Sequence, residues 1–257
     1  MKHLALFAAL AATSCFAAHA EQFPTPPAMK PEMTEFWTPQ PAVVTPGEYA
    51  QDGMQNPPSD AIVLFDGTNL DQWISAKDGT SAAPWTVENG YVMVKPGSGD
   101  IRTKATFDDF QLHIEWSTPA DTLGKTSQGR GNSGVFLQGI YEVQMLDVYN
   151  NKTYSNGQAG SIYKQTRPLV NAMRPPMKWN VYDIIYTAPR FKQDGSVRFP
   201  ARVTVLHNGV VVQNNTTILG PTEYIGIPQY RPHGKGPLQL QDHGNTMRFR
   251  NIWVRPL

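Results

Sequence analysis

The chain has 257 residues, with 22 lysines and arginines against 21 aspartates and glutamates, so its net charge is +1. Nucleic-acid binding normally requires a clustered basic excess, which this balance does not provide, so we expect no nucleic-acid partner. Charged residues make up only 17 %, while the chain contains 21 glycines and 22 prolines. This composition disfavours a helical bundle and favours a turn-rich β protein.

Residues 1–20 have the pattern of a signal peptide. A short polar start is followed by an almost unbroken apolar run over residues 4–18, and Ala18-His19-Ala20 supplies the small-x-small pattern that signal peptidase recognises. We expect cleavage after Ala20 and export to the periplasm or the medium. The run is too short to span a bilayer and no second one follows, which predicts no integral membrane segment. Cys15 is the single cysteine; a lipid anchor on it is the less favoured alternative, because the usual leucine three residues earlier is missing.

Residues 21–59 form a Pro-rich N-terminal arm that precedes one predicted domain over residues 60–257. The segment up to Asp60 contains nine of the 22 prolines. It also contains Phe36 and Trp37, and a solvated linker seldom includes such large aromatics. We expect the arm to pack on the domain through these two side chains; a disordered tether is the alternative.

From residue 60 onward the sequence shows short β-like runs separated by turns. Asn89-Gly90 and Asn208-Gly209 are strong hairpin signals, and Gly139 separates two further runs. The segment 165–172 has the pattern of one helical turn. So many short strands predict an all-β sandwich or jelly roll. The predicted strands cover residues 62–65, 85–87, 91–94, 110–116, 135–138, 141–145, 179–186, 201–206, 210–212, 238–240 and 247–254.

Glu142, Gln144 and Asp147 form the most informative motif, with the spacing E-x-Q-x-x-D along one predicted strand. Alternation places Glu142 and Gln144 on the same face, which we expect to be the concave one. Asp147 joins that face only if a bulge falls near Leu146. Glycosidases hold a sugar between two carboxyl groups about 5–10 Å apart. The motif therefore predicts a sugar-cleaving site, or else the solvent face of an edge strand.

Polar residues flank this strand in the sequence. Arg130 and Asn132 precede its hairpin partner, and an arginine beside carboxylates either stabilises developing charge or forms a structural ion pair. Near the C-terminus, Gln241 is followed by His243. Histidine is a natural acid or base at neutral pH, and in a loop it is also a common hydrogen-bonded turn residue. We expect these side chains to converge with Glu142 in one cleft.

The pair His113 and Glu115 lies two residues apart on one predicted strand face and has the donor types of a metal site. Structural pairing of the two side chains is the stronger interpretation. No motif demands a cofactor, so a divalent metal ion is the single candidate. The Walker loop, the dinucleotide fingerprint and the nucleophile elbow of hydrolases are all missing from the sequence.

Five segments in order resemble the bacterial 3-keto-disaccharide hydrolase family: residues 60–73, 130–147, 157–172, 178–191 and 236–257, among them RGNSGVFLQGIYEVQMLD. The resemblance implies a concanavalin A-like jelly roll, usually exported, that acts on glycosides oxidised at C3. Two positions depart from the family pattern. Lys164 stands where glycine is common, and Met177-Lys178 stands where Gly-Glu is common before Trp179.

The implied chemistry suits these residues. A ketone at C3 acidifies the hydrogen on C2, so a base removes it, the aglycone leaves C1 by β-elimination, and water then adds. Glu142 or His243 is the candidate base, and Arg130, with or without a metal, would stabilise the enolate oxygen. Asp147 would be the acid or its orienting partner. The candidates for binding the sugar are Asn132, Gln144, Gln241, Glu115 and Trp179.

Three other functions remain open from the residues alone. An envelope-associated structural protein is suggested by the Pro-rich arm but would leave the polar cluster unexplained. An ordinary glycosidase would use Glu142 and Asp147 as its two carboxylates, and the ketone would be irrelevant. A lectin-like module would bind carbohydrate without cleaving it, because the same sandwich fold serves both purposes. A lectin groove has no need of clustered ionisable side chains, which is the feature that separates the two classes.

Overall fold

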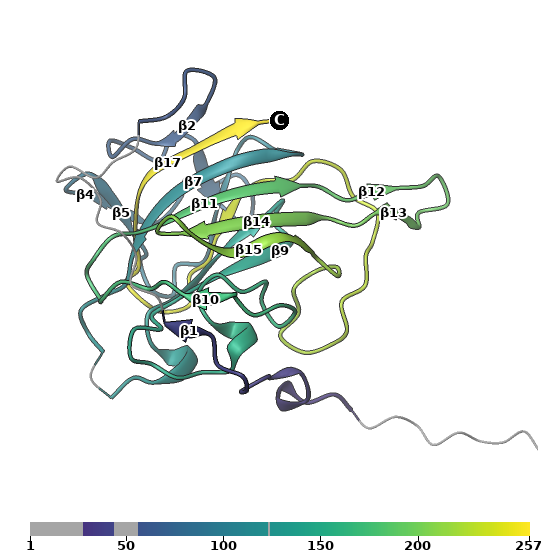
Figure 1. Cartoon of the computed structure of the whole chain (residues 1–257). Coiled ribbons are helices and arrows are strands. Elements are labelled where there is room, and N and C mark those ends of the chain that lie inside the picture. Colours follow the sequence, from purple (N-terminus) through teal and green to yellow (C-terminus); the bar gives the residue numbers. More distant parts are fainter. Residues whose placement is uncertain (1–27, 44–55, 123) are drawn as a thin grey trace, which may run out of the picture.

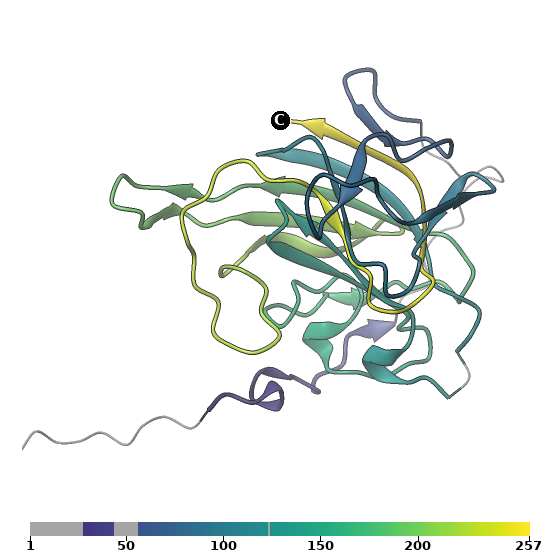
Figure 2. The same ribbon diagram turned by 180° about the vertical axis from the view of Figure 1, so that it is seen from behind.

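A computed structural model describes residues 28–43, 56–122 and 124–257. The predicted leader over residues 1–20, with Cys15, lies outside these described residues. The described part is a sandwich of two antiparallel β-sheets (Figures 1 and 2), which confirms the predicted all-β jelly-roll class. No helix in the described ranges is long and apolar enough to cross a membrane.

The larger sheet contains most of the long strands. Its order is β15 (Val210–Thr217), β14 (Arg202–His207), β11 (Asn180–Thr187), β7 (Phe110–Ser117), β17 (Arg248–Pro256), β5 (Tyr91–Met93) and β4 (Thr86–Glu88), and β2 (Ile62–Phe65) also pairs with β17. The smaller sheet has the order β3 (Trp73–Ser75), β6 (Ile101–Thr103), β16 (Gln239–Leu240), β8 (Asn132–Leu137) and β9 (Tyr141–Leu146).

Asn-Gly turns form two hairpins as predicted. Asn89 and Gly90 connect β4 to β5, and Asn208 and Gly209 connect β14 to β15; all four have positive φ. This left-handed conformation suits asparagine and glycine and matches the twist of the paired strands. Gly139 likewise has positive φ, at 70°, in the β8–β9 hairpin.

The core lies between the two sheets. On the larger sheet, Trp116 and Tyr182 are fully buried in it, and Val143 and Met145 of β9 face them from the smaller sheet. Two phenols join the layers: the Tyr182 hydroxyl donates to the Gln144 carbonyl at 2.8 Å, and the Tyr186 hydroxyl donates to Gln138 at 2.8 Å. These bonds fix β9 against the larger sheet, so its alternate residues face outward.

The predicted helical turn over residues 165–172 is wrong. The segment is instead a turn that leads into β10 (Val170–Asn171), which pairs in parallel with β1 (Ala42–Val43) of the arm. Pairing with a remote strand overrides the local pattern. Further short elements are the hairpin of β12 (Arg190–Phe191) with β13 (Val197–Phe199), and the 3-10 turns Pro31–Thr34, Ser127–Gly129 and Ser155–Gly157.

Residues 28–43 of the arm lie along the domain, but Phe36 and Trp37 are not the buried anchors that we predicted. They remain 56 % and 50 % exposed. Trp37 touches only the edge of the Tyr154 ring, and main-chain carbonyls of the arm add hydrogen bonds: the Phe36 carbonyl accepts from Ser155, and Asn156 donates to the Thr34 carbonyl at 2.9 Å. Buried backbone carbonyls need hydrogen-bond donors, and a short Pro-rich segment cannot supply them from regular secondary structure of its own. The polar side chains of the domain supply them instead.

Candidate functional site

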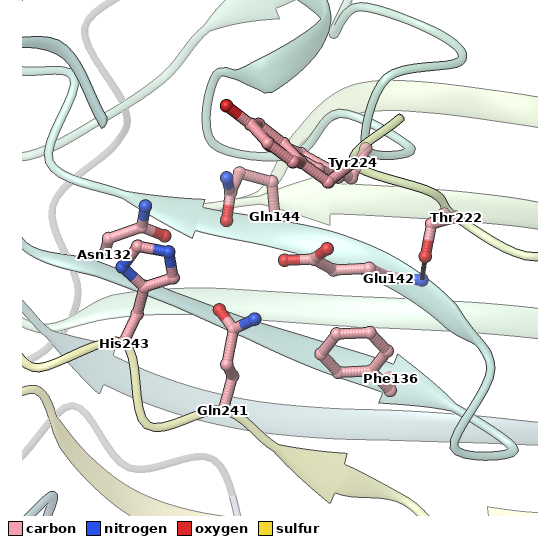
Figure 3. A pocket seen from close by; sticks show the side chains of 9 residues that line it. Asn132, Phe136, Glu142, Gln144, Thr222, Tyr224, Gln241 and His243 are labelled. Carbon is pink, nitrogen blue, oxygen red and sulfur yellow. Dashed lines mark hydrogen bonds between the residues drawn. The ribbon is translucent and has the colours of Figure 1, made fainter. Parts of the chain in front are cut away.

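A pocket of about 220 Å³ lies on the face of the smaller sheet that is turned away from the larger one. We call it the β9 pocket, and Figure 3 shows its polar side chains gathered around Glu142. Its size suits one sugar ring rather than an extended chain. It is lined by Asn132, Phe136, Glu142, Gln144, Tyr163, Thr222, Tyr224, Gln241 and His243.

The β8–β9 hairpin places Glu142 in this pocket. In its register Phe136 lies opposite Glu142 and Gly134 lies opposite Gln144. Residues opposite each other in an antiparallel pair point to the same face, so these side chains share the outer one. Gly134 leaves the room that the carboxyl occupies, because a Cβ there would lie 2.3 Å from Glu142 Oε1.

The Glu142 carboxyl is buried and unpaired. The residue is 5 % exposed, its amide donates to the Thr222 hydroxyl at 3.0 Å, and no described residue donates a hydrogen bond to its carboxyl oxygens. Burial, helped by the negative charge of Asp100, raises the pKa of Glu142 from 4.5 to about 8. A carboxylate with so high a pKa is a strong base, which is the property expected of a group that removes protons from carbon.

Two amide oxygens in the pocket are also without partners. Asn132 Oδ1 and Gln241 Oε1 are buried and have no hydrogen-bond partner among the described residues. The nitrogen of Asn132 is held by the Gln128 carbonyl at 2.8 Å, so its oxygen is free to face a ligand. Buried acceptors without donors are costly in an empty site and are satisfied by a bound hydroxyl.

Gln144 forms a wall of the pocket and is already satisfied. Its nitrogen donates to Gln128 Oε1 at 3.1 Å, and its oxygen accepts from the Met145 amide at 3.0 Å. The predicted sugar-binding role is therefore weaker for Gln144 than for Asn132 and Gln241. Its amide instead orders Gln128, which in turn fixes Asn132.

His243 reaches the pocket from the loop after β16. The loop is fastened at both ends: the Asp242 amide donates to Asp100 at 2.8 Å, and Asn245 accepts from the Gly131 amide at 2.9 Å. His243 itself is exposed. The prediction that Glu142, Asn132, Gln241 and His243 converge agrees with this geometry, with His243 at the mouth and Glu142 at the buried end.

Arg130 and Asp147 do not line the pocket. They form an ion pair, with Nε 2.7 Å from Oδ2, and Arg130 also donates to the Tyr149 carbonyl. The other Asp147 oxygen accepts from the Tyr149 amide at 3.0 Å. β9 ends at Leu146 without the bulge that would return Asp147 to the outer face. The structure therefore gives this pair the role of holding a loop, in place of the catalytic roles predicted for it.

Glu115 lies on β7 of the larger sheet, and Trp179 immediately precedes β11 of that sheet. Glu115 accepts from Arg250 at 2.7 Å and from Asn251 at 2.9 Å, and Arg250 lies over the Trp179 ring at 4.4 Å. His113 pairs with Asp183 at 2.7 Å. Neither Glu115 nor Trp179 lines the β9 pocket, because both lie in the layer of the larger sheet, so their predicted contact with the sugar has no support from this pocket.

No group of three His, Cys, Asp or Glu side chains within the described ranges is arranged to hold a metal ion. His113 and Glu115, the pair considered for this role, are occupied by Asp183, Arg250 and Asn251. With these partners in place, His113 and Glu115 do not fit a divalent cation, and the metal ion considered from the sequence stays a prediction.

Four lining residues escaped the sequence reasoning: Phe136, Tyr163, Thr222 and Tyr224. Phe136 follows from the hairpin register and could have been found by alternation. Tyr163 and the 222–224 segment lie in irregular loops, where no periodicity marks the orientation of a side chain. Thr222 is fastened to β9 by its bonds to Glu142 and to the Ile140 carbonyl.

Comparison with known proteins supports a carbohydrate-active site. Residues 60–255 match the sequence profile of the 3-keto-alpha-glucoside-1,2-lyase-like domain. A protein of Bacteroides thetaiotaomicron named 3-keto-disaccharide hydrolase is 24 % identical over 243 residues, covering 76 % of this chain and 78 % of that protein.

Two crystal structures of glycosyl hydrolase candidates from Parabacteroides distasonis are similar to this fold. One has 59 % sequence identity and a TM-score of 0.77, and the match covers 88 % of this chain and 96 % of the other. The second has 22 % identity and a TM-score of 0.54, with 77 % and 94 % covered. The second supports the fold alone, whereas the first agrees with the chain in both fold and sequence.

Proposed function

The chain belongs to the 3-keto-alpha-glucoside-1,2-lyase-like family and is glycosyl hydrolase-like, and from this premise we propose that it cleaves glycosides oxidised at C3, with Glu142 as the base. The observation that carries the proposal is the unpaired Glu142 carboxyl, buried in a sugar-sized pocket with its pKa raised to about 8. Export is part of the proposal and rests on the signal-like sequence of residues 1–20.

The first step is removal of the C2 proton. The carboxylate of Glu142 takes the proton, and the electron pair of the C2–H bond forms an enolate with the C3 carbonyl. The enolate then expels the aglycone: its electrons form a double bond between C1 and C2, and the C1–O bond breaks. Water added to C1, with return of a proton to C2, completes a net hydrolysis.

The remaining pocket residues bind and protonate. Asn132 Oδ1 and Gln241 Oε1 accept hydrogen bonds from sugar hydroxyls. These bonds remove the unfavourable free energy of two buried acceptors that have no partner in the unbound protein. His243 stands at the exposed mouth, where the aglycone leaves, and donates a proton to the departing oxygen.

The two alternative functions, an ordinary glycosidase and a lectin, require different side chains in the pocket. An ordinary glycosidase needs a second carboxyl in the pocket, but Asp147 is held by Arg130 and Tyr149 outside it. A lectin has no use for a buried, unpaired carboxyl, which weakens binding of a neutral sugar by its desolvation cost. Both alternatives remain outcomes of the test.

The test compares 3-keto-glycosides with their unoxidised parents in deuterium oxide, with and without chelator. We expect release of the aglycone from the keto substrate alone, with deuterium entering C2. Glu142→Gln keeps the shape of the side chain and removes its basicity, so the rate should fall on the order of 100-fold or more. Aglycone release and C2 exchange are followed by mass spectrometry.

The matched control is Glu223→Gln, which removes an exposed carboxyl that stands between Thr222 and Tyr224 in the sequence but does not itself line the pocket. It should keep the wild-type rate. Equal cleavage of both sugars without C2 exchange would establish the ordinary glycosidase. Binding of both sugars without cleavage of either would establish the lectin.

A further inference from the structure

The enolate needs a hydrogen-bond donor on its oxygen, and Arg130, the group predicted for this, lies outside the pocket. Among the described lining residues there is no lysine or arginine. The Thr222 hydroxyl donates to the Ile140 carbonyl at 3.2 Å, and the Gln144 and Asn132 nitrogens donate to Gln128. These donors are occupied, so the pocket offers few groups that can serve the enolate.

Tyr163 is a donor that remains available. Its hydroxyl lies 2.8 Å from the Tyr154 hydroxyl. Burial raises the pKa of Tyr163 to about 12, while the hydrogen bond with Tyr154 opposes that rise and the charge of Glu142 adds to it. When Tyr154 donates, the Tyr163 proton is directed away from Tyr154. A phenol that accepts one hydrogen bond is also a stronger donor in the next.

Glu142 and Tyr163 face the same small volume. Both line the β9 pocket, and the charge of one affects the ionisation of the other. The reaction demands this arrangement: the base acts on C2, and the donor acts on the oxygen of C3, the adjacent carbon. Base and donor must therefore lie on neighbouring parts of a single sugar ring.

Behind Tyr154 stands a buried lysine that comes from the same loop. The Lys164 side chain is 3 % exposed, and its ammonium lies 4.7 Å from the centre of the Tyr154 ring. It pairs with Glu35 of the arm at 3.2 Å and donates to the Pro31 carbonyl at 3.0 Å. Trp37 of the arm contacts the edge of Tyr154, with ring centroids 6.3 Å apart.

Lys164 adopts a backbone conformation that is unfavourable for a lysine. Its φ is 61°, in the left-handed region that glycine occupies without strain. The contacts of its ammonium with the arm and with Tyr154 compensate for this strain. Because the Lys164 ammonium is buried and in contact with the Tyr154 ring, its role is to fix the position of that ring.

We propose that Tyr163 is a catalytic hydrogen-bond donor to the C3 oxygen, and that Tyr154, Lys164 and Glu35 are positioning residues through which the N-terminal arm holds that donor in place. The role rests on the proposed function. No proton needs to leave Tyr163: the hydroxyl strengthens its hydrogen bond as charge moves from the C2–H bond onto the C3 oxygen, and it returns to its first state when the aglycone departs.

The closing experiment measures exchange of the C2 hydrogen in a free 3-keto-monosaccharide, which has no aglycone, together with kcat and KM on the keto-glycoside. Tyr163→Phe should slow exchange and kcat by roughly 100-fold and change KM by less than about threefold, because the donor acts mainly on the developing charge. The exposed Tyr149→Phe, outside the pocket, should keep wild-type rates.

Tyr154→Phe distinguishes the effect of losing the Tyr163 donor from the effect of losing the hydrogen bond between the two phenols. Tyr163→Phe and Tyr154→Phe both lose that bond, but only the first loses the donor, so Tyr154→Phe should slow exchange roughly tenfold. Lys164→Met should produce a similar decrease in exchange, and Lys164→Arg should recover most of it. Thermal melting of each variant identifies any that has lost its fold.

Each failure has its own signature. If the wild type exchanges C2 and Glu142→Gln does not, yet Tyr163→Phe exchanges within about threefold of the wild type, the donor role is wrong and the proposed function stands. Equal effects of Tyr163→Phe and Tyr154→Phe would make both phenols structural. A wild type that neither exchanges C2 nor cleaves the keto-glycoside would overturn the proposed function and the donor role together.

Discussion

Glu142 shows how burial prepares a single residue for chemistry. An ionised carboxylate removed from water without hydrogen bonds is unfavourable, so the proton is held more tightly and the pKa rises to about 8. Asp100 adds to this effect from a neighbouring strand end, where it accepts from Gln239 at 2.8 Å. The same desolvation makes Glu142 a strong base and lowers the stability of the folded chain as the pH rises from 4.5 to about 8, the window between its ordinary and its raised pKa.

The pKa of Glu142 predicts the pH dependence of the reaction. A general base acts when deprotonated, so the rate of C2 exchange in the free 3-keto-monosaccharide, which has no aglycone for His243 to protonate, should rise with pH and level off above about 8. Asp100→Asn removes a negative charge that raises this pKa, so the midpoint of the rise should move to lower pH. A pH–rate profile of both proteins checks this. A midpoint near that of an ordinary glutamate in the wild type would contradict the role of burial.

At the scale of elements, the β8–β9 hairpin fixes where the base can act. Gly134 on β8 is the position where the neighbouring strand leaves space for the Glu142 carboxyl, since any Cβ would meet it at 2.3 Å. Gly134 needs no unusual φ, so its role is one of space. The backbone of β8 can accommodate an alanine at position 134, but the methyl group would collide with the Glu142 carboxyl.

Gly134→Ala should therefore reduce activity far more than stability. The new methyl group displaces the carboxyl from the wall of the pocket, and we expect kcat to fall at least roughly tenfold while the melting temperature changes by only a few degrees. Gly129→Ala is the matched control, because Gly129 has open space around its Cβ position and no positive φ. Equal activity of both variants would show that Glu142 tolerates displacement.

At the scale of the whole molecule, the arm completes the wall behind the pocket. It contributes Glu35 to the buried Lys164, a carbonyl to Ser155 and a parallel strand to β10. Without the arm, the Lys164 ammonium would lose its negative partner in a setting that is largely dry. Removing one member of a buried ion pair is costly, because the other charge stays behind unpaired.

Deletion of residues 1–55 should lower the melting temperature by several degrees and reduce kcat on a keto-glycoside. Deletion of residues 1–27 is the control, since it removes none of the contacts of Glu35 with Lys164 or of β1 with β10. Calorimetry and steady-state kinetics check both deletions. An arm-free domain with unchanged melting and unchanged kcat would show that the arm is a passive tether.

The sequence alone predicted the longer strands and the local orientation of Glu142, but not the short strands β3 and β6. Alternation and Asn-Gly turns act over a few neighbouring residues, so β7, β11 and the hairpins follow from them, as does the shared face of Glu142 and Gln144. They do not place Glu115 and Trp179, two sugar-binding candidates that do not line the β9 pocket, because alternation shows that two residues share a face but not which sheet that face belongs to.

Which groups meet in the pocket follows from the packing of segments that are far apart in the sequence. β16 inserts between β6 and β8 and brings Gln241 beside Glu142, while the 222–224 segment and Tyr163 arrive from irregular loops. The end of β9 at Leu146 turned Asp147 toward Arg130 and out of the pocket. These contacts depend on pairing between segments far apart in the chain. The free energy that stabilises them comes from burial and hydrogen bonds across the whole sandwich, so no local sequence pattern predicts them.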